Sequence, residues 1–362
     1  MMKSTCGDAP LTNHRIQEAI WLCSEAGGAN DLHKAVALRI RLYAIMCSNN
    51  FRVVPATVAG AEPKVMLEYY DPSTGPTGST IFEGIFKWAS NLVSAKAEEL
   101  AYRFDWFLDL QMVPFVASRN LSLTLLQSKA NAALLAELNN HPTVHSRVAA
   151  AATVGTGMGS ISYWVKDAEL PVPAPHPVYA PTNLHLLAST AGGVGYNAGD
   201  FVAMQLFDYV VGNPDRYNGG NFLFQNHLTT GWHNKIIAID HGSAFQENFG
   251  GDLFGDPSLL GVIPSFATIN TQLRVPGAFQ HEIAGAGVRG GPSVHLFPFP
   301  LHIGTDVAIT NVCPRLKAKI ATITPTNVDQ FLLKAGLGLT DPTYRQRVVD
   351  RYNDIKILLG KF

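Results

Sequence analysis

The stretch from Phe207 to Phe245 constrains the chain most, because it places two polar motifs at the ends of apolar segments. An apolar, helix-like run ends in Asn213-Pro214-Asp215-Arg216, and an apolar, strand-like run ends in Asp240. Between the two motifs, Asn221 directly precedes a short alternating run that is typical of a strand. The pattern predicts a helix, a loop and a hairpin that bring Asp215, an asparagine and Asp240 to one place.

These residue types suit the transfer of a phosphate from ATP. The reaction needs one carboxylate that orients the acceptor hydroxyl and accepts its proton, and an asparagine with an aspartate that hold Mg²⁺ on the phosphates. Mg²⁺ takes hard oxygen ligands and keeps several waters, so one or two carboxylates and the substrate complete its coordination. Taken singly, each motif is more often a turn or a strand end. Their order and spacing together favour a phosphotransfer site.

The stretch resembles the catalytic and metal-binding loops of the atypical kinases, which include the phosphatidylinositol 3-/4-kinases, actin-fragmin kinase, the HipA kinases and the secretory-pathway kinases. They share a GN-x-D-R…N loop and a later I-D-x-G. The resemblance implies that Asp215 is the catalytic base and that Asn221 and Asp240 bind the metal. These families place the metal asparagine five residues after the base, whereas Asn221 lies six after Asp215. Either a bulge at Gly219-Gly220 restores the geometry, which we favour, or Asn218 takes the role.

A lysine and a glutamate form a second set of candidates. Lys87 follows a strand-like run and is flanked by Phe86 and Trp88, and a strongly helical run then carries Glu98 and Glu99. The atypical kinases have a similar G-x-F-K followed by E-x-x-A-Y. The resemblance implies that Lys87 holds the ATP phosphates and that Glu98 pairs with it, which restrains the lysine charge at the α- and β-phosphates. Glu99 is the competing partner.

Three strand-like runs precede these residues, at positions 51–54, 65–70 and 80–87, and turn formers separate them. They predict an antiparallel sheet. Either connection is suited to cover phosphates, because small residues let backbone N–H groups approach an anion. Neither contains a Walker sequence. The order of the strands favours the connection with Gly60 over the one at residues 71–78.

A further strand-like run at residues 161–166 directly follows a cluster of glycines. Because no helix follows that cluster, it is not a dinucleotide-binding fingerprint. In the atypical kinases a Gly-Ser pair and an aromatic-rich strand lead into the hinge between the lobes. The resemblance implies that Tyr163, Trp164 and Val165 border the adenine, and an ordinary core strand is the alternative.

Together, the elements and the resemblance predict an α+β, two-lobed kinase-like fold with an antiparallel-sheet N-lobe and a mainly helical C-lobe. Residues 1–50 are expected to form an N-terminal helical extension. Residues 51–166 are expected to form the N-lobe, with the hinge strand at its end, and residues 167–362 the C-lobe, with the catalytic and metal-binding loops.

Several smaller elements are also expected. Residues 113–116 are predicted to form a strand and residues 117–152 a helical stretch, and two helices are predicted to close the C-lobe at residues 328–337 and 342–359. In the second of two N-terminal helices within residues 12–48, apolar residues follow helical spacing at Leu32, Val36, Ile40, Tyr43 and Met46-Cys47.

Composition bounds the partners and the location. A net charge of −1 over 362 residues gives no general attraction to nucleic acid or to an anionic membrane. Residues 1–10 lack the apolar core of a secretory signal, and no run approaches the ~18 apolar residues of a membrane span. We expect a cytoplasmic chain, although signal-less secretion into a host cell would escape this test. The four cysteines show no CxxC spacing and are expected to be free thiols.

The sequence thus predicts an ATP- and Mg²⁺-dependent kinase. Residues 246–300 contain no lysine and only two arginines, so nothing there gathers charge to hold a phosphoinositide headgroup. We therefore expect a protein substrate with a serine or threonine hydroxyl. Two alternatives stay open: an AMP transferase or a lipid or small-molecule kinase on the same fold, and a catalytically inactive kinase-like binding module.

Overall fold

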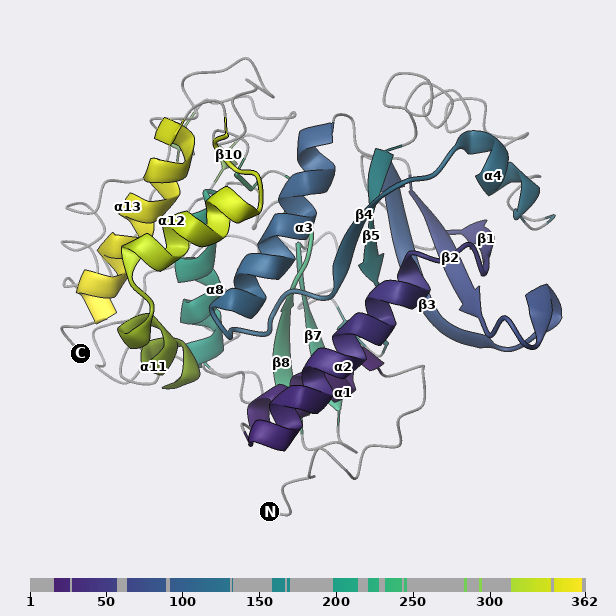
Figure 1. Cartoon of the computed structure of the whole chain (residues 1–362), viewed down its shortest axis with the longest axis horizontal. Coiled ribbons are helices and arrows are strands. Elements are labelled where there is room, and N and C mark those ends of the chain that lie inside the picture. Colours follow the sequence, from purple (N-terminus) through teal and green to yellow (C-terminus); the bar gives the residue numbers. More distant parts are fainter. Residues whose placement is uncertain are drawn as a thin grey trace. The chain divides into compact units, whose positions relative to one another are not determined.

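The chain divides into two compact units, and each is described by itself. Unit 1 contains Met1–Tyr102, Pro114–Lys166 and Thr229–Gly231, and unit 2 contains Arg103–Val113, Asp167–Leu228 and Trp232–Phe362. The computed structural model (Figure 1) describes residues 16–26, 28–56, 64–88, 92–130, 132, 158–166, 168–169, 198–213, 221–227, 232–242, 244–245, 283–284, 293–294, 314–339 and 342–359.

Unit 1 is built on a five-stranded antiparallel sheet. Its order is β1-β2-β3-β5-β4, so β5, the last of the five strands along the sequence, lies between β3 and β4. The strands are β1 (Phe51–Pro55), β2 (Lys64–Tyr70), β3 (Thr80–Trp88), β4 (Val116–Asn120) and β5 (Met158–Tyr163). The three strands predicted at residues 51–54, 65–70 and 80–87 are confirmed.

A row of aromatic side chains crosses this sheet on its buried face. Phe51, Tyr69, Phe82 and Tyr163 each come from one of four neighbouring strands, with successive ring centroids 5.7, 4.7 and 5.7 Å apart. Cross-strand aromatic pairs contribute roughly 0.2–1 kcal/mol each beyond alanine. The row therefore fixes the strand register and ends at Tyr163, the last residue of β5.

Four α-helices accompany the sheet: α1 (Ile16–Ala26), α2 (Ala29–Met46), α3 (Leu92–Phe107) and α4 (Leu123–Ser128). Eight residues of α1 are buried, including three polar ones, Gln17, Glu18 and Ser24. α3 begins in unit 1, and its last residues, from Arg103 on, belong to unit 2.

The buried face of α2 is not the one that the sequence pattern predicted. Four of the predicted apolar residues are exposed, namely Leu32 by 43%, Val36 by 47%, Ile40 by 65% and Tyr43 by 49%, whereas Met46 is buried. A second apolar stripe is buried instead, namely Ala35, Leu38, Leu42 and Met46. Both stripes have helical spacing, so periodicity alone does not distinguish them.

Unit 2 is mainly helical in the described residues, with α8 (Ala198–Val211), α11 (Pro314–Thr322), α12 (Pro325–Lys334) and α13 (Pro342–Leu359). A small sheet has the order β6-β7-β8, from β6 (Ala168–Glu169), β7 (Phe222–His227) and β8 (Trp232–Ala238). β9 (Ile283–Ala284) pairs with β10 (Ser293–Val294). The predicted α+β class, with an antiparallel sheet in one unit and mainly helices in the other, is confirmed, as are the two closing helices.

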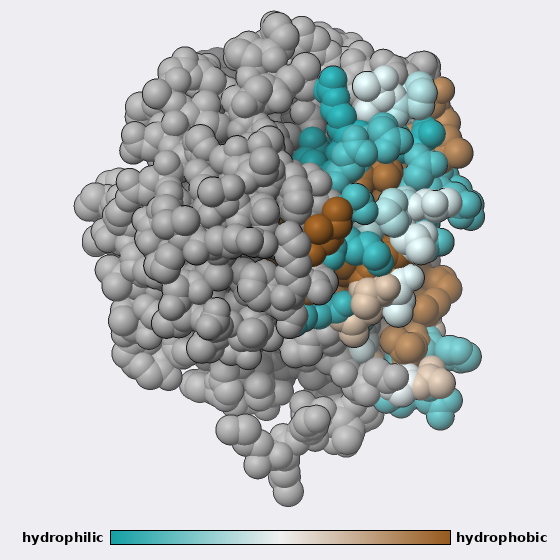
Figure 2. Space-filling model, turned by 90° about the vertical axis from the view of Figure 1, so that its left-hand side faces the viewer, coloured by the Kyte–Doolittle hydropathy of each residue, from teal (hydrophilic) through white to brown (hydrophobic). Residues whose placement is uncertain are grey.

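The core of unit 2 is centred on Phe104, near the end of α3. Its ring lies 6.2 Å from that of Phe207 in α8, 6.4 Å from Phe245 and 5.7 Å from Phe331 in α12. On the face drawn in Figure 2, hydrophobic residues form separate patches between hydrophilic ones. Among the residues that the structure describes, no helix is long and apolar enough to cross a membrane.

Two element predictions are wrong in position, and one cysteine prediction is wrong. The strand expected at residues 113–116 is β4, from Val116 to Asn120, so the helical stretch expected from residue 117 begins only with α4. Pairing with β5 overrides the local pattern there, and most of residues 129–152 lie outside the described part. Cys23 is disulfide-bonded, whereas Cys47 is free as expected. A disulfide is not what a reducing compartment predicts, and the cytoplasmic location stays a prediction.

Candidate active site

Lys87 and Glu98 form a buried ion pair in unit 1, which we call the lysine half-site. Lys87 lies near the end of β3 and Glu98 in α3, and Lys87 Nζ donates a hydrogen bond to Glu98 Oε1 at 2.5 Å. Only 8% of Lys87 and 2% of Glu98 is exposed. The structure thus brings together the lysine and the glutamate that the resemblance paired.

The burial of this pair has a physical meaning. Removing two charges from water is costly, and an apolar pair of similar volume is often as stable or more so. Removing one partner alone leaves an uncompensated buried charge. A buried ion pair is therefore weak evidence for stability, and it is a candidate for a functional role of the charge.

Glu99, the competing partner, makes a different contact. Its Oε2 accepts a hydrogen bond from the backbone N–H of Ser118 at 3.1 Å, and Ser118 Oγ donates to the carbonyl of Ala95 at 3.0 Å. These bonds tie α3 to β4. Because adjacent helical residues point about 100° apart, the two glutamates reach two different strands.

β5 approaches the lysine strand closely. Ser160 lies opposite Lys87, and Gly159 lies opposite Trp88. A Cβ atom at Gly159 would lie 2.2 Å from the carbonyl oxygen of Lys87 and 2.6 Å from the ring of Phe86. Only glycine fits at this position, so the glycine cluster allows β5 to pair with the strand that carries Lys87.

Lys64 lies directly opposite Lys87 across β2 and β3 and was not among the predicted site residues. Directly opposite residues of an antiparallel pair point to the same face of the sheet, and like charges there destabilise the pair. A bound anion on this face would favour both charges. The signal in the sequence was a lysine immediately after the turn-rich connection that contains Gly60, but only the strand register shows its neighbour.

The register also separates the two turn-rich connections. The connection with Gly60 enters β2 at Lys64, beside Lys87, whereas the other one joins β2 to β3 at the far end, where Tyr70 pairs with Thr80. Gly60 itself lies outside the described residues, so its role as a phosphate loop stays a prediction.

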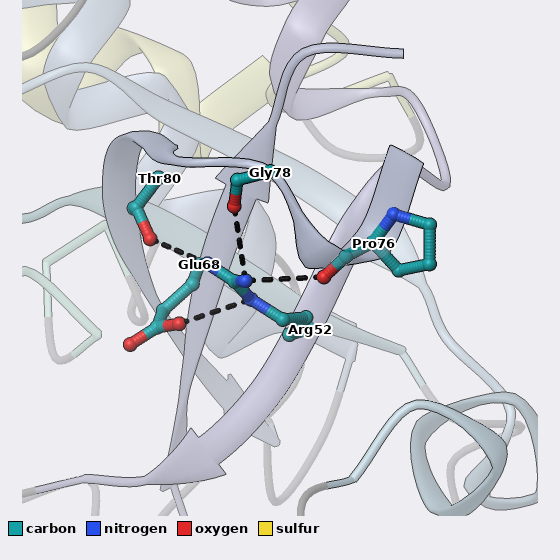
Figure 3. A network of polar contacts seen from close by, with 5 residues as sticks. All are labelled: Arg52, Glu68, Pro76, Gly78 and Thr80. Atoms are coloured by element: carbon teal, nitrogen blue, oxygen red, sulfur yellow. Dashed lines mark hydrogen bonds and ion pairs between the residues drawn. The ribbon is translucent and has the colours of Figure 1, made fainter. Parts of the chain in front are cut away.

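Arg52 holds the second of these connections in place (Figure 3). Its Nη1 donates to the carbonyl oxygens of Pro76 and Gly78, both at 3.1 Å, and its Nη2 donates to Thr80 Oγ1 at 2.7 Å. Its Nε lies 3.2 Å from Glu68 Oε2. The rigid fork of donors in a guanidinium suits this use. The connection is therefore a turn tied to β1 by its carbonyl groups.

The predicted hinge residues lie at and just after the end of β5. Tyr163 N–H donates to the carbonyl of Phe115, and Trp164 N–H donates to the carbonyl of Glu83, both at 2.9 Å. Tyr163 and Val165 are buried, and Trp164 is half-buried. Tyr163 thus belongs to the core row, and Trp164 and Val165 follow the strand. That these three residues border the adenine stays a prediction.

Asn221 and Asp240 form the aspartate half-site in unit 2. They flank the same end of the hairpin of β7 and β8, where Phe222 pairs with Ala238. Ile239 N–H donates to the carbonyl of Asn221 at 3.1 Å, so Asn221 lies one residue before Phe222 and Asp240 lies two residues after Ala238, the last pair of the two strands. Both are half-buried. An amide oxygen and a carboxylate are hard oxygen donors, and this pair fits a magnesium ion.

Asp240 has an unusual backbone conformation. Its φ angle is 58°, in the left-handed region that non-glycine residues seldom adopt. Such residues cost about 1–3 kcal/mol and cluster at functional sites, where the surrounding structure enforces them. Aspartate tolerates the region better than most residues do. The conformation turns the chain sharply at the strand end and marks Asp240 as a functional candidate.

The end of α8 leads into the loop that is expected to be catalytic. Gly212, with φ of 64°, ends the helix. Asn213 N–H donates to the carbonyl of Asp208 at 2.9 Å, and its side-chain amide lies 3.4 Å from Asp208 Oδ1. Arg351 in α13 donates to the carbonyl of Val210 at 3.0 Å. Side chains of two helices thus anchor the start of the loop.

The remaining predicted residues lie outside the described part of the chain, namely Asp215, Asn218 and Gly60. The choice between Asn218 and Asn221 as metal ligand therefore stays open. Among the described residues, no three or more histidine, cysteine, aspartate or glutamate side chains gather into a metal site.

The structure thus has a lysine on the third strand of an antiparallel sheet, paired with a helix glutamate, and an asparagine and an aspartate at a hairpin end, as the resemblance to the atypical kinases predicts. Comparisons with known proteins add little to this. No protein-family model matches the chain. No curated protein matches it in sequence.

Solved structures similar to the chain include a Golgi casein kinase with Mn/ADP bound, at 14% identity and a TM-score of 0.47, which covers 88% of this chain and 76% of that one. The structure of hydra Fam20 with sugar has 12% identity and a TM-score of 0.48, and it covers 90% of this chain and 89% of that one. Both likenesses are too distant to assign an activity.

Proposed function

We propose that the protein is an ATP-dependent kinase that phosphorylates a serine or threonine hydroxyl of a protein. The buried Lys87–Glu98 pair carries the proposal, because two desolvated charges on β3 and α3 are better explained by phosphate binding than by stability. The strained Asp240 beside Asn221 supports it independently.

The roles follow from the chemistry of the residues. Lys87, restrained by Glu98, holds the α- and β-phosphates, and Tyr163, Trp164 and Val165 border the adenine. Asp215 orients the acceptor hydroxyl and accepts its proton as the new oxygen–phosphorus bond forms and ADP leaves. Asn221 and Asp240 hold Mg²⁺, which neutralises charge on the phosphates when it is bound.

A protein acceptor is the substrate class that the sequence favours. Residues 246–300, which follow the aspartate half-site, contain only Arg274 and Arg289 as permanently charged cations. A phosphoinositide headgroup carries several phosphates and needs a cluster of basic side chains. A peptide hydroxyl needs no such cluster.

The test is transfer of label from γ-labelled ATP with Mg²⁺, with the protein alone and with a cell lysate. We expect labelled protein bands that disappear in Asp215→Ala, Asp240→Ala and Lys87→Met. Asp329→Asn is the control, because this carboxylate makes an ion pair with Arg345 between α12 and α13. Intact transfer in Asp240→Ala would overturn the assignment.

Two alternatives give different results in the same experiment. Transfer from α-labelled ATP, with a product heavier by AMP, would indicate an AMP transferase. Absence of both transfer and Mg²⁺-dependent ATP binding would indicate an inactive binding module, which the six-residue spacing from Asp215 to Asn221 favours.

A further inference from the structure

Every residue of α1 whose burial the structure describes is buried. Its polar residues Gln17 and Glu18 are exposed by only 1% and 4%. Burying such groups costs free energy unless they are hydrogen-bonded. The bonds that they make lead directly to the strand end that precedes the predicted hinge.

Gln17 binds the backbone next to β4. Its Oε1 accepts a hydrogen bond from the N–H of Phe115 at 2.8 Å, and the carbonyl of the same residue accepts one from Tyr163 N–H at 2.9 Å. Phe115 is thus held on both sides of its backbone, by α1 and by the end of β5. Its ring also lies 4.7 Å from that of Tyr102 in α3.

Glu18 contacts the hinge side directly. Tyr163 Oη donates to Glu18 Oε2 at 3.4 Å, while the tyrosine ring stacks on Phe82 at 5.7 Å. Both the ring and the hydroxyl of Tyr163 are therefore held. The next residue, Trp164, is fixed by its N–H bond to Glu83.

From these contacts we infer that α1 is part of the nucleotide site, with Gln17 and Glu18 as positioning residues. They hold Phe115 and Tyr163, and through them the backbone of Trp164, in the conformation that receives adenine. The inference rests on the proposed function, and it adds that nucleotide affinity depends on a helix that does not itself touch the nucleotide.

Nucleotide affinity should depend on α1 because it depends on the fraction of molecules that hold the hinge in the binding conformation. When only a fraction of molecules holds the hinge correctly, the apparent dissociation constant rises by the inverse of that fraction. Loss of either α1 bond removes one of the two side-chain bonds by which α1 holds Phe115 and Tyr163. Coupling between connected sites commonly amounts to fivefold or more, so we expect roughly a fivefold weaker affinity.

α1 also offers a matched control. Ser24 is as buried as Glu18, at 4% exposure, and its Oγ donates to the carbonyl of Ile20 within the same helix. Ser24→Ala removes a buried hydrogen bond of α1 that does not lead to the hinge. It separates a general loss of stability from a loss of positioning.

The experiment measures Mg²⁺-dependent binding of a fluorescent ADP analogue. Gln17→Ala, Glu18→Ala and Tyr163→Phe are each expected to raise its dissociation constant about fivefold. Glu18→Gln keeps an acceptor oxygen and should restore most of the affinity. Because Glu18 and Tyr163 share one bond, the double variant should lose little more than either single one. Equal losses in Ser24→Ala and Gln17→Ala would overturn the inference.

Hydrogen exchange separates this inference from the proposed function. The amides of Phe115 and Trp164 should exchange faster in Gln17→Ala than in Ser24→Ala, with or without nucleotide. If the wild-type protein binds no nucleotide, the proposed function is wrong. Faster exchange in Gln17→Ala would then still support the positioning role of α1. Equal exchange rates of these amides in Gln17→Ala and Ser24→Ala would reject the positioning role of α1, even if the protein binds nucleotide.

Discussion

The two half-sites differ in what holds them. In the lysine half-site, two charged side chains from β3 and α3 meet in a buried ion pair. In the aspartate half-site, the backbone sets the positions of the two residues. The hairpin register places Asn221 opposite Ile239, the residue before Asp240, and a left-handed φ turns the chain at Asp240. The lysine half-site should therefore lose stability and activity when one charge of the pair is removed. The aspartate half-site should be sensitive to changes in its backbone conformation or in its oxygen ligands.

The largest expected effect is at the lysine half-site. Lys87→Met leaves Glu98 buried without its partner, which should lower the free energy of unfolding by about 3–5 kcal/mol. Phosphotransfer should fall by about a hundredfold or more, because the positive charge proposed to hold the α- and β-phosphates is lost. Denaturant unfolding and the label-transfer assay measure the two effects.

The double variant Lys87→Met with Glu98→Gln sharpens this result. Removing both charges should restore much of the stability, because no uncompensated charge stays buried. Activity should stay lost. Recovery of activity in the double variant would contradict a phosphate-binding role for Lys87.

At the aspartate half-site, activity and stability should separate in single variants. Asp240→Gly removes the carboxylate but suits a φ of 58°, so stability should change by less than about 1 kcal/mol. Asp240→Asn keeps a residue that tolerates this region. Both variants should lose label transfer about a hundredfold and lose the dependence of ATP binding on Mg²⁺. A large loss of stability in Asp240→Gly would mean that the strain is absent.

A smaller effect is expected at Lys64, and it tests whether this lysine belongs to the lysine half-site. Lys64→Gln should weaken ATP binding roughly fivefold, since one cation near a phosphate contributes on the order of 1 kcal/mol in a partly wet site. Lys166→Gln is the control, because that lysine makes an ion pair with Glu83 at 2.6 Å. Similar losses in both variants would show a general charge effect rather than a contact.

The two half-sites were predictable to different extents. The residue types, their order and the resemblance made Lys87, Asn221 and Asp240 candidates, because phosphotransfer needs a cation and hard oxygen ligands, and their roles stay predictions. The choice of Glu98 over Glu99 depends on how α3 packs against the sheet, which helical spacing does not reveal. The φ of Asp240 is a property of the folded chain and has no local signal.

The remaining differences from the predictions also arise in tertiary structure. The neighbour of Lys64 depends on the register of β2 and β3. β4 lies later than expected because it pairs with β5. In α2, two apolar stripes of equal spacing compete, and only packing selects the one with Leu38 and Leu42. Sequence patterns identify the elements more readily than their buried faces.

The smallest expected effect is on the free energy of unfolding at alkaline pH, where one tyrosine in each unit can be compared. Burial raises the pKa of Tyr69 in unit 1 and of Tyr352 in unit 2 above the ordinary value. Tyr69 Oη donates to the carbonyl of Met46 at 2.9 Å, and Tyr352 Oη donates to that of Ile323 at 3.1 Å. Both hydroxyls thus stay protonated in the folded chain when the unfolded chain begins to ionise.

Because the pKa is raised on folding, each tyrosine contributes stability that is fully present below the unfolded pKa of about 10 and is lost as pH rises toward the folded pKa. The slope is at most about 1.4 kcal/mol per pH unit for each tyrosine. Tyr69→Phe and Tyr352→Phe should each flatten the fall in unfolding free energy between roughly pH 10 and 11. The variant with the flatter curve identifies the unit that unfolds first. An unchanged slope in both variants would mean that neither hydroxyl ionises on unfolding.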